Sequence, residues 1–146
     1  MQPATSLAPR RIAVAPPLLR RRLALVVDED VESASMAALA LGTEGWHTIV
    51  ANDPLTAAAL ARDLPVDILV AGHDMPGMSG VDLAAVVRVH HANLPVLLMS
   101  HERDGQRPAV EPPFMFLAKP FRLRALYRVI DSLAGSVGVA GTPGMS

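Results

Sequence analysis

The most constraining feature of the chain is a regular alternation of short apolar runs with segments of helical periodicity. The runs are rich in Val, Leu, Ile and Ala at consecutive positions, which is typical of strands buried on both faces of a parallel sheet. The pattern therefore predicts a five-stranded parallel sheet covered by helices on both faces, an α/β fold. The predicted strands are 23–27, 46–51, 66–71, 95–100 and 114–118, and the predicted helices are 31–44, 54–64, 81–91 and 121–134.

One connection departs from this alternation. The segment 101–113 is polar and contains Pro108, Pro112 and Pro113. Proline inside a helix removes a backbone hydrogen bond and clashes with the preceding turn. We therefore expect less helix here than in any other connection between strands.

The two ends of the chain differ from its body. Residues 1–22 contain five arginines, several prolines and no acid, whereas the other 124 residues carry eight basic and fourteen acidic side chains, a net charge of −6. We predict a disordered basic extension over 1–22, one domain over 23–134 and a flexible Gly-rich tail over 135–146.

Composition excludes several classes of protein. The chain has no cysteine, which rules out disulfides and Cys-ligated metal sites and fits a reducing cytoplasm, where we expect the protein to reside. No apolar run approaches the length of a membrane span, so we expect no membrane partner. Aromatic residues make up 3% of the chain, which disfavours a stacking surface for single-stranded nucleic acid.

Polar residues follow four of the predicted strands. In open parallel sheets, ligands bind at the carboxyl ends of the strands. That edge would bring together Asp28-Glu29, Gly72-His73-Asp74, Ser100-His101 and Lys119-Pro120. Acids rather than a Gly-rich loop follow the first strand, which disfavours a nucleotide-binding protein.

These strand ends resemble the receiver domain of bacterial two-component response regulators. The resemblance covers residues 23–134 and is carried by Val26-Val27-Asp28-Glu29, by Met75-Pro76-Gly77-Met78-Ser79-Gly80, by Ser100 and by Lys119-Pro120-Phe121. Lys119 is the only lysine in the chain. The resemblance implies a flavodoxin-like fold with strand order 2-1-3-4-5 and a role in phosphorelay signalling.

The resemblance also implies a metal and phosphoryl site. The acid pair after the first strand holds Mg²⁺ in that family, and here the pair is Asp28 and Glu29, which suit a cation that prefers oxygen ligands. Lys119 matches the family lysine that contacts the phosphoryl group.

Three further residues match family positions. Ser100 corresponds to the hydroxyl that hydrogen-bonds a phosphoryl oxygen, and Phe116 corresponds to the switch aromatic of the fifth strand, although ordinary core packing explains Phe116 equally well. The resemblance implies a cis peptide bond before Pro120.

The chain departs from the family at the phosphorylated aspartate. That aspartate lies three residues before the Met-Pro dipeptide, which here is Gly72, and glycine has no nucleophile. Asp74 lies two residues further along the loop and is a poor substitute. We therefore expect weak Mg²⁺ binding by Asp28 and Glu29, with Asp74 as an additional ligand, and we expect Lys119 to turn toward Asp28 or Glu29.

The proline-rich 101–113 segment is the second departure, and it predicts a short, distorted or lost fourth helix. Both departures favour a receiver that is not an enzyme and that acts as a protein-interaction module independently of phosphorylation. Its expected partner is a histidine kinase, another regulator or a second copy, without specific nucleic-acid binding. The alternative is a single-domain receiver that accepts a phosphoryl group on a nearby acid such as Asp74.

Overall fold

A computed structural model describes residues 22–101 and 111–134 of the chain. Its five strands form one sheet in which every adjacent pair is parallel, and their order is β3-β2-β4-β5-β6. This order confirms the predicted topology, with the first strand between the second and the third. The strands are β2 (Leu23–Val27), β3 (His47–Ala51), β4 (Ile68–Gly72), β5 (Val96–Ser100) and β6 (Phe114–Ala118).

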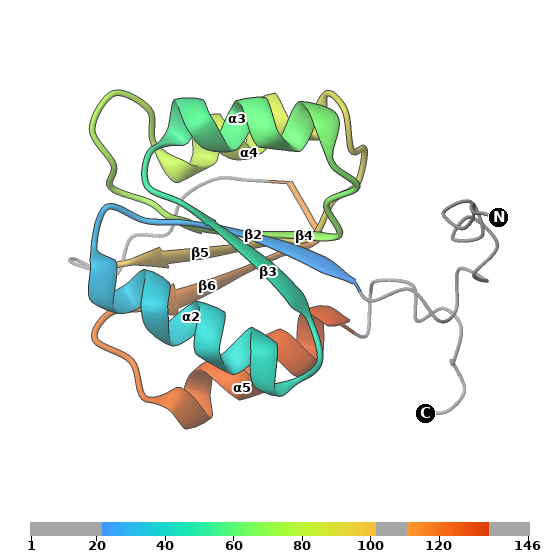
Figure 1. The fold of residues 1–146 in the computed structure, drawn as a ribbon. Helices are drawn as coiled ribbons and strands as arrows, with labels where there is room; N and C mark the ends of the chain where they lie inside the picture. The colour runs from blue at the N-terminus through green and yellow to red at the C-terminus, as the bar shows by residue number, and fades with distance from the viewer. Residues whose placement is uncertain (1–21, 102–110, 135–146) are drawn as a thin grey trace, which may run out of the picture.

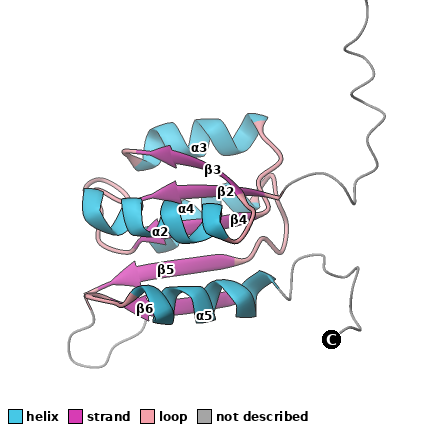
Figure 2. Cartoon of the chain, turned by 60° about the horizontal axis from the view of Figure 1, so that its bottom comes forward, coloured by secondary structure: helices cyan, strands magenta, loops and turns pink. Residues whose placement is uncertain are grey.

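Helices cover both faces of this sheet (Figure 1). Helices α3 and α4 pack on one face, and α2 and α5 pack on the other, as Figure 2 shows from a second direction. The fold is therefore the expected three-layer α/β sandwich. The helices are α2 (Val31–Thr43), α3 (Pro54–Asp63), α4 (Gly80–Arg88) and α5 (Leu123–Ala134).

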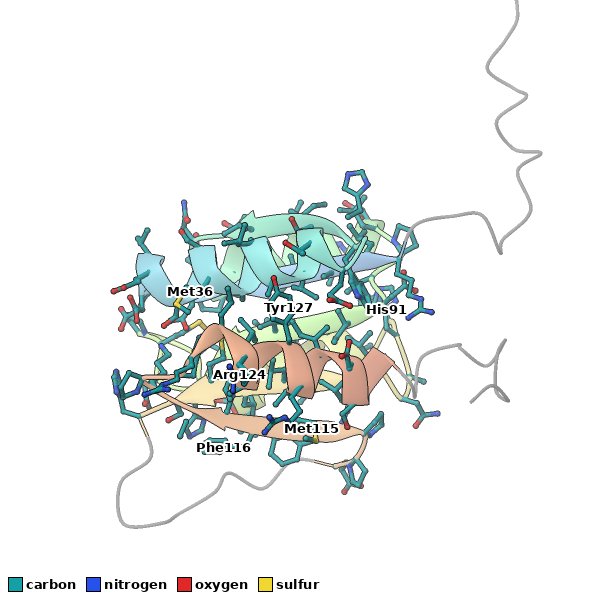
Figure 3. The ribbon with its side chains drawn as sticks, turned by 90° about the horizontal axis from the view of Figure 1, so that it is seen from below. Met36, His91, Met115, Phe116, Arg124 and Tyr127 are labelled. Atoms are coloured by element: carbon teal, nitrogen blue, oxygen red, sulfur yellow. The ribbon has the colours of Figure 1, made fainter. Side chains whose placement is uncertain are left out.

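The sheet separates two apolar cores. Leu25, Leu69 and Leu98 belong to the core under α3 and α4, whereas the neighbouring Val26 and Val70 belong to the core under α2 and α5. All residues of β2, β4 and β5 are buried, because these central strands are covered on both faces. Figure 3 shows side chains at the rim of the second core, among them Met36, Met115 and Tyr127.

Short polar side chains fix where the helices begin. Asp30, Asp53 and Ser79 each accept a hydrogen bond from a backbone N–H of the first turn of α2, α3 and α4, respectively. Gly45 follows the end of α2 with a φ of +92°, a conformation that glycine adopts without steric cost. These caps and the glycine stop confirm the predicted helix boundaries near α2 and α3.

Three predicted boundaries were wrong by two or three residues. Helix α5 begins at Leu123 rather than at residue 121. Helix α4 ends at Arg88 rather than at residue 91, where the N–H groups of Val89 and His90 donate to carbonyls three residues back and the chain enters a turn. Strand β4 begins at Ile68 rather than at residue 66. The side chain of Asp67 instead accepts a hydrogen bond from the N–H of Leu23 at 2.8 Å.

The connection between β5 and β6 contains no helix in its described parts, His101 and 111–113, and the rest of it lies outside the described residues. The predicted ends 1–21 and 135–146 lie outside them too. Arg22, at the end of the predicted extension, places its guanidinium 5.5 Å from the ring centre of Trp46. No helix in the described part of the chain is long and apolar enough to cross a membrane.

Arg88 anchors the end of this connection. Its guanidinium donates two hydrogen bonds to the carbonyl of Leu94, at 3.0 and 2.6 Å, and one each to the carbonyls of Glu111 and Pro113, both at 2.8 Å. Burial lowers the pKa of Arg88 below its ordinary value, but arginine stays charged at neutral pH. Arg88 therefore ties the chain that enters β6 to the end of α4.

Replacing Arg88 tests this anchor. Arg88→Met removes the donors of all three carbonyls, and we expect it to lower the free energy of unfolding by about 1–3 kcal/mol in urea denaturation. Arg62→Met is the matched control. Arg62 is exposed and lies 4.0 Å from Asp63, so its loss should cost less than about 0.5 kcal/mol. Equal effects of the two variants would contradict the anchoring role.

Candidate functional site

Four residues of the candidate site meet at the carboxyl edge of the sheet. Gly72 ends β4, Ser100 ends β5, and Asp28 and Lys119 directly follow β2 and β6. The register pairs Val27 with Ala71, which places Asp28 beside Gly72 on adjacent strands. The N–H of Lys119 donates to the carbonyl of Ser100 at 2.8 Å, and this hydrogen bond joins the carboxyl ends of β5 and β6.

Asp28 is a buried carboxylate with both oxygens engaged. The residue is 4% exposed. Its Oδ1 accepts a hydrogen bond from the N–H of Asp30 at 3.0 Å, and its Oδ2 lies 2.8 Å from the ammonium of Lys119. Burying a charge is costly unless it is paired, so the contact with Lys119 is needed to offset the cost of burying the Asp28 carboxylate.

Lys119 is also nearly buried, with 8% of its side chain exposed. Among the described residues it pairs with Asp28 at 2.8 Å and with Asp30 Oδ2 at 3.6 Å. The expected turn of Lys119 toward Asp28 is therefore confirmed. The second acid beside it is Asp30, whereas Glu29 is exposed.

Asp30 has two roles in this geometry. Its carboxylate caps α2, accepting from the hydroxyl of Ser33 at 2.7 Å and from the N–H of Glu32 at 3.2 Å. The Ser33 hydrogen bond, with a smaller contribution from the charge of Lys119, lowers the pKa of Asp30 below its ordinary value of 3.8. Sequence reasoning missed this second acid, although an acid directly before a helical segment is a recognisable N-cap signal.

Gly72 lies in direct contact with the Asp28 carboxylate. A Cβ atom built on Gly72 would lie 2.6 Å from Oδ1, 2.7 Å from Cγ and 2.8 Å from Oδ2 of Asp28. Glycine is the residue that allows another group to approach its backbone so closely. The space where a side chain of residue 72 would begin is therefore filled by a carboxylate from the neighbouring strand.

Asp74 and Ser100 form a separate pair. Ser100 is buried, and its hydroxyl donates to Asp74 Oδ2 at 3.2 Å, whereas Asp74 itself is exposed. The ion pairs of Lys119 within the described residues do not include Asp74. The predicted pocket residues thus divide into a buried Asp28–Lys119 pair and an outer Asp74–Ser100 pair.

The acids of the site fit a divalent cation poorly. No three His, Asp or Glu side chains in the described ranges group closely enough to hold a metal ion. Asp28 directs one oxygen to a backbone N–H and the other to a cation, Lys119. A hard cation such as Mg²⁺ takes several oxygen ligands and would have to displace that ammonium.

The two remaining residues of the predicted site are Pro120 and Phe116. The peptide bond between Lys119 and Pro120 is cis, as the resemblance implied. Phe116 is 9% exposed and belongs to the core under α3 and α4, so its position agrees with the interpretation as core packing.

One cavity at this edge lies on the side of Lys119 toward α2 and the start of α5. It has a volume of about 210 Å³, and neither Asp28, Gly72 nor Ser100 lines it. Asp28 and Gly72 are thus packed against each other behind the wall of this cavity. Its lining residues are Asp30, Glu32, Ser33, Met36, His101, Lys119, Pro120 and Phe121.

Substitution of glycines tests the close packing at Gly72. We expect Gly72→Ala to lower the free energy of unfolding by about 1–3 kcal/mol, because the new methyl group forces the Asp28 carboxylate to move. Gly42→Ala is the control. A Cβ there meets nothing within 4 Å, so alanine should stabilise α2 by about 0.5–1 kcal/mol. A stabilising effect of Gly72→Ala in urea denaturation would contradict the geometry.

Curated proteins resemble the chain in sequence. The probable transcriptional regulatory protein TcrX of Mycobacterium tuberculosis is 35% identical over 114 residues, which are 71% of this chain and 49% of TcrX. The DNA-binding response regulator MtrA of the same species is 33% identical over 86 residues, 59% of this chain and 37% of MtrA. The chain spans about half or less of the length of these relatives.

Solved structures resemble it in fold. The chemotaxis response regulator CheY4 of Vibrio cholerae superposes with a TM-score of 0.70 at 23% identity, over 78% of this chain and 99% of CheY4. The receiver domain of the sensor histidine kinase PA1611 of Pseudomonas aeruginosa, whose structure holds a magnesium ion in its active site cleft, superposes with a TM-score of 0.68 at 18% identity, over 80% and 99% of the two chains.

The profile of the response regulator receiver domain matches residues 24–131 of this chain. The match covers all described strands except Leu23 and most of α5, and it includes Asp28, Gly72, Ser100 and Lys119. With the strand order and the arrangement of the strand ends, it shows that the chain belongs to the receiver domain family of two-component response regulators.

Proposed function

We propose that this receiver domain is a non-enzymatic protein-interaction module whose binding state does not depend on aspartyl phosphorylation. The observation that carries the proposal is Gly72 together with the Asp28 carboxylate packed against it. The position that matches the phosphorylated aspartate of the family thus has no side chain and no free space in front of it.

The chemistry of phosphoryl transfer supports this proposal. Transfer to a receiver needs an exposed carboxylate in line with the donor phosphorus, while cations stabilise the charge of the transferred group. Asp28 is no substitute, because its side chain is 1% exposed and is paired with Lys119. Neither positioning nor charge compensates for an attacking atom that the donor cannot reach.

The alternative is a receiver that accepts a phosphoryl group on Asp74. Exposure of this carboxylate and the hydroxyl of Ser100 beside it favour the alternative. Against it, the ammonium of Lys119 is engaged by Asp28 and Asp30, so no cation among the described residues is positioned to stabilise a phosphoryl group on Asp74.

Magnesium binding would be weak in this proposal. The ammonium of Lys119 already compensates the charge of Asp28. The other acids at this edge that could contribute ligand charge to a metal are Glu29, Asp30 and Asp74. Affinities on the order of millimolar are typical of sites with so few charged ligands.

The proposed partner is a protein: a histidine kinase, another regulator or a second copy of this chain. A groove of about 330 Å³ between β6 and α5 suits an acidic protein segment, because three exposed arginines and no acid line it, with apolar side chains between them. Arg124 of this groove is labelled on α5 in Figure 3. The three arginines of the groove are Arg122, Arg124 and Arg128.

The net charge of −6 over 23–146 disfavours a nucleic acid as the partner. The absence of cysteine fits a cytoplasmic location.

Incubation with a small phosphodonor tests the proposal. The full chain, treated with acetyl phosphate or phosphoramidate and magnesium, should show no mass gain of a phosphoryl group by intact-protein mass spectrometry. Asp74→Asn should behave in the same way. An acid-labile phosphoryl group on the natural chain that is absent from Asp74→Asn would contradict the proposal and establish the alternative.

A further inference from the structure

The buried Asp28 carboxylate occupies a place that is built for an anion. It lies between the ammonium of Lys119, 2.8 Å from Oδ2, and the Cα of Gly72, where an added Cβ would lie within 2.8 Å of all three carboxylate atoms. The N–H of Asp30 donates to its Oδ1 at 3.0 Å. A cation, a backbone donor and a side-chain-free wall are what a small anion needs in order to bind.

The carboxylate that fills this place comes from the chain itself. Asp28 is attached to the end of β2, so it is always present at a high effective concentration, whereas a free anion pays the entropic cost of association. It also compensates the charge of Lys119, whose side chain is 8% exposed and would otherwise have Asp30, at 3.6 Å, as its nearest counter-charge among the described residues. An external anion must therefore displace a tethered one.

We propose that Asp28 is an internal anion that occupies the Lys119–Gly72 pocket and keeps it closed to phosphate and other small anions. This inference rests on the proposed function, because it requires that position 72 carries no phosphorylated side chain. The geometry explains why glycine stands at position 72, since any larger residue displaces the carboxylate. Removing the Asp28 carboxylate is expected to expose an anion site at Lys119.

The single lysine makes the test direct. An amine-acetylating reagent modifies Lys119 and, besides it, the terminal amine, so the peptide that contains Lys119 reports one side chain by mass spectrometry. In the natural chain of 146 residues we expect Lys119 to react several-fold more slowly than in the same chain unfolded in urea. A rate equal to that of the unfolded chain would overturn the proposal.

Two variants release Lys119 by different means. Asp28→Ala removes the carboxylate, and Gly72→Ala displaces it while every charge is kept. Both should raise the acetylation rate several-fold. Their controls are Glu29→Ala, which removes the same charge at an exposed neighbouring position, and Gly42→Ala, where a Cβ meets nothing within 4 Å. An unchanged rate in Gly72→Ala would overturn the proposal even if Asp28→Ala does not fold.

Inorganic phosphate identifies the exposed site. In Asp28→Ala, added phosphate should slow the acetylation of Lys119 and raise the Tm relative to chloride at equal ionic strength. Both effects should be larger than in the natural chain, where phosphate acts only as a general stabilising salt. Phosphate effects of the same size in both chains would overturn the proposal. The two proposals fail by different results. If Lys119 of the natural chain is acetylated as fast as in the unfolded chain but the chain takes no phosphoryl group, only the proposal of an internal anion is refuted. If the natural chain is phosphorylated, the proposed function is refuted.

Discussion

A charge in the interior of a protein must be compensated, and in this chain the carboxylate of Asp28 is compensated by Lys119. The two side chains are 1% and 8% exposed, and their charged atoms lie 2.8 Å apart. Loss of either partner would leave the other nearly buried without its closest counter-charge, which is among the most destabilising changes a protein core can undergo. The ends of the strands place the two side chains where each meets this requirement for the other.

The fold brings the two partners together from distant parts of the sequence. Asp28 follows β2, and Lys119 follows β6, which is separated from β2 in the sheet by β4 and β5. The position of β6 depends in turn on Arg88, which holds the chain at Glu111 and Pro113 just before the strand. On the other side, Gly72 leaves room for the carboxylate. Residues at the ends of four elements, β2, β4, β6 and α4, thus contribute to one buried contact.

Sequence alone predicts the parts of this account that depend on local pattern. The bounds of β2 and β6 were predicted correctly, because each apolar run is bounded by polar residues or proline. The alternation predicted a parallel sheet covered on both faces, and the resemblance to receiver domains implied its strand order. The approach of Lys119 to Asp28 was predicted from the missing acid at position 72, which that resemblance also identifies.

The features that sequence missed depend on distances in three dimensions. Nothing in the sequence distinguishes Arg88 from the other arginines, and its role appears only once the 111–113 segment lies beside it. Asp30 rather than Glu29 lies near Lys119, because the cap of α2 fixes its carboxylate. The contact between Asp28 and Gly72 is likewise invisible in the sequence, since it depends on a rotamer and on the register of two strands.

A double-mutant cycle between Asp28 and Lys119 tests the buried pair most directly. The free energy of unfolding is measured for the natural chain, for Asp28→Asn, for Lys119→Met and for the double variant. Because the two groups are in contact and shielded from water, the account predicts a coupling energy of about 1–3 kcal/mol, with the double variant less destabilised than the sum of the single variants. Additive effects, with a coupling energy near zero, would contradict it.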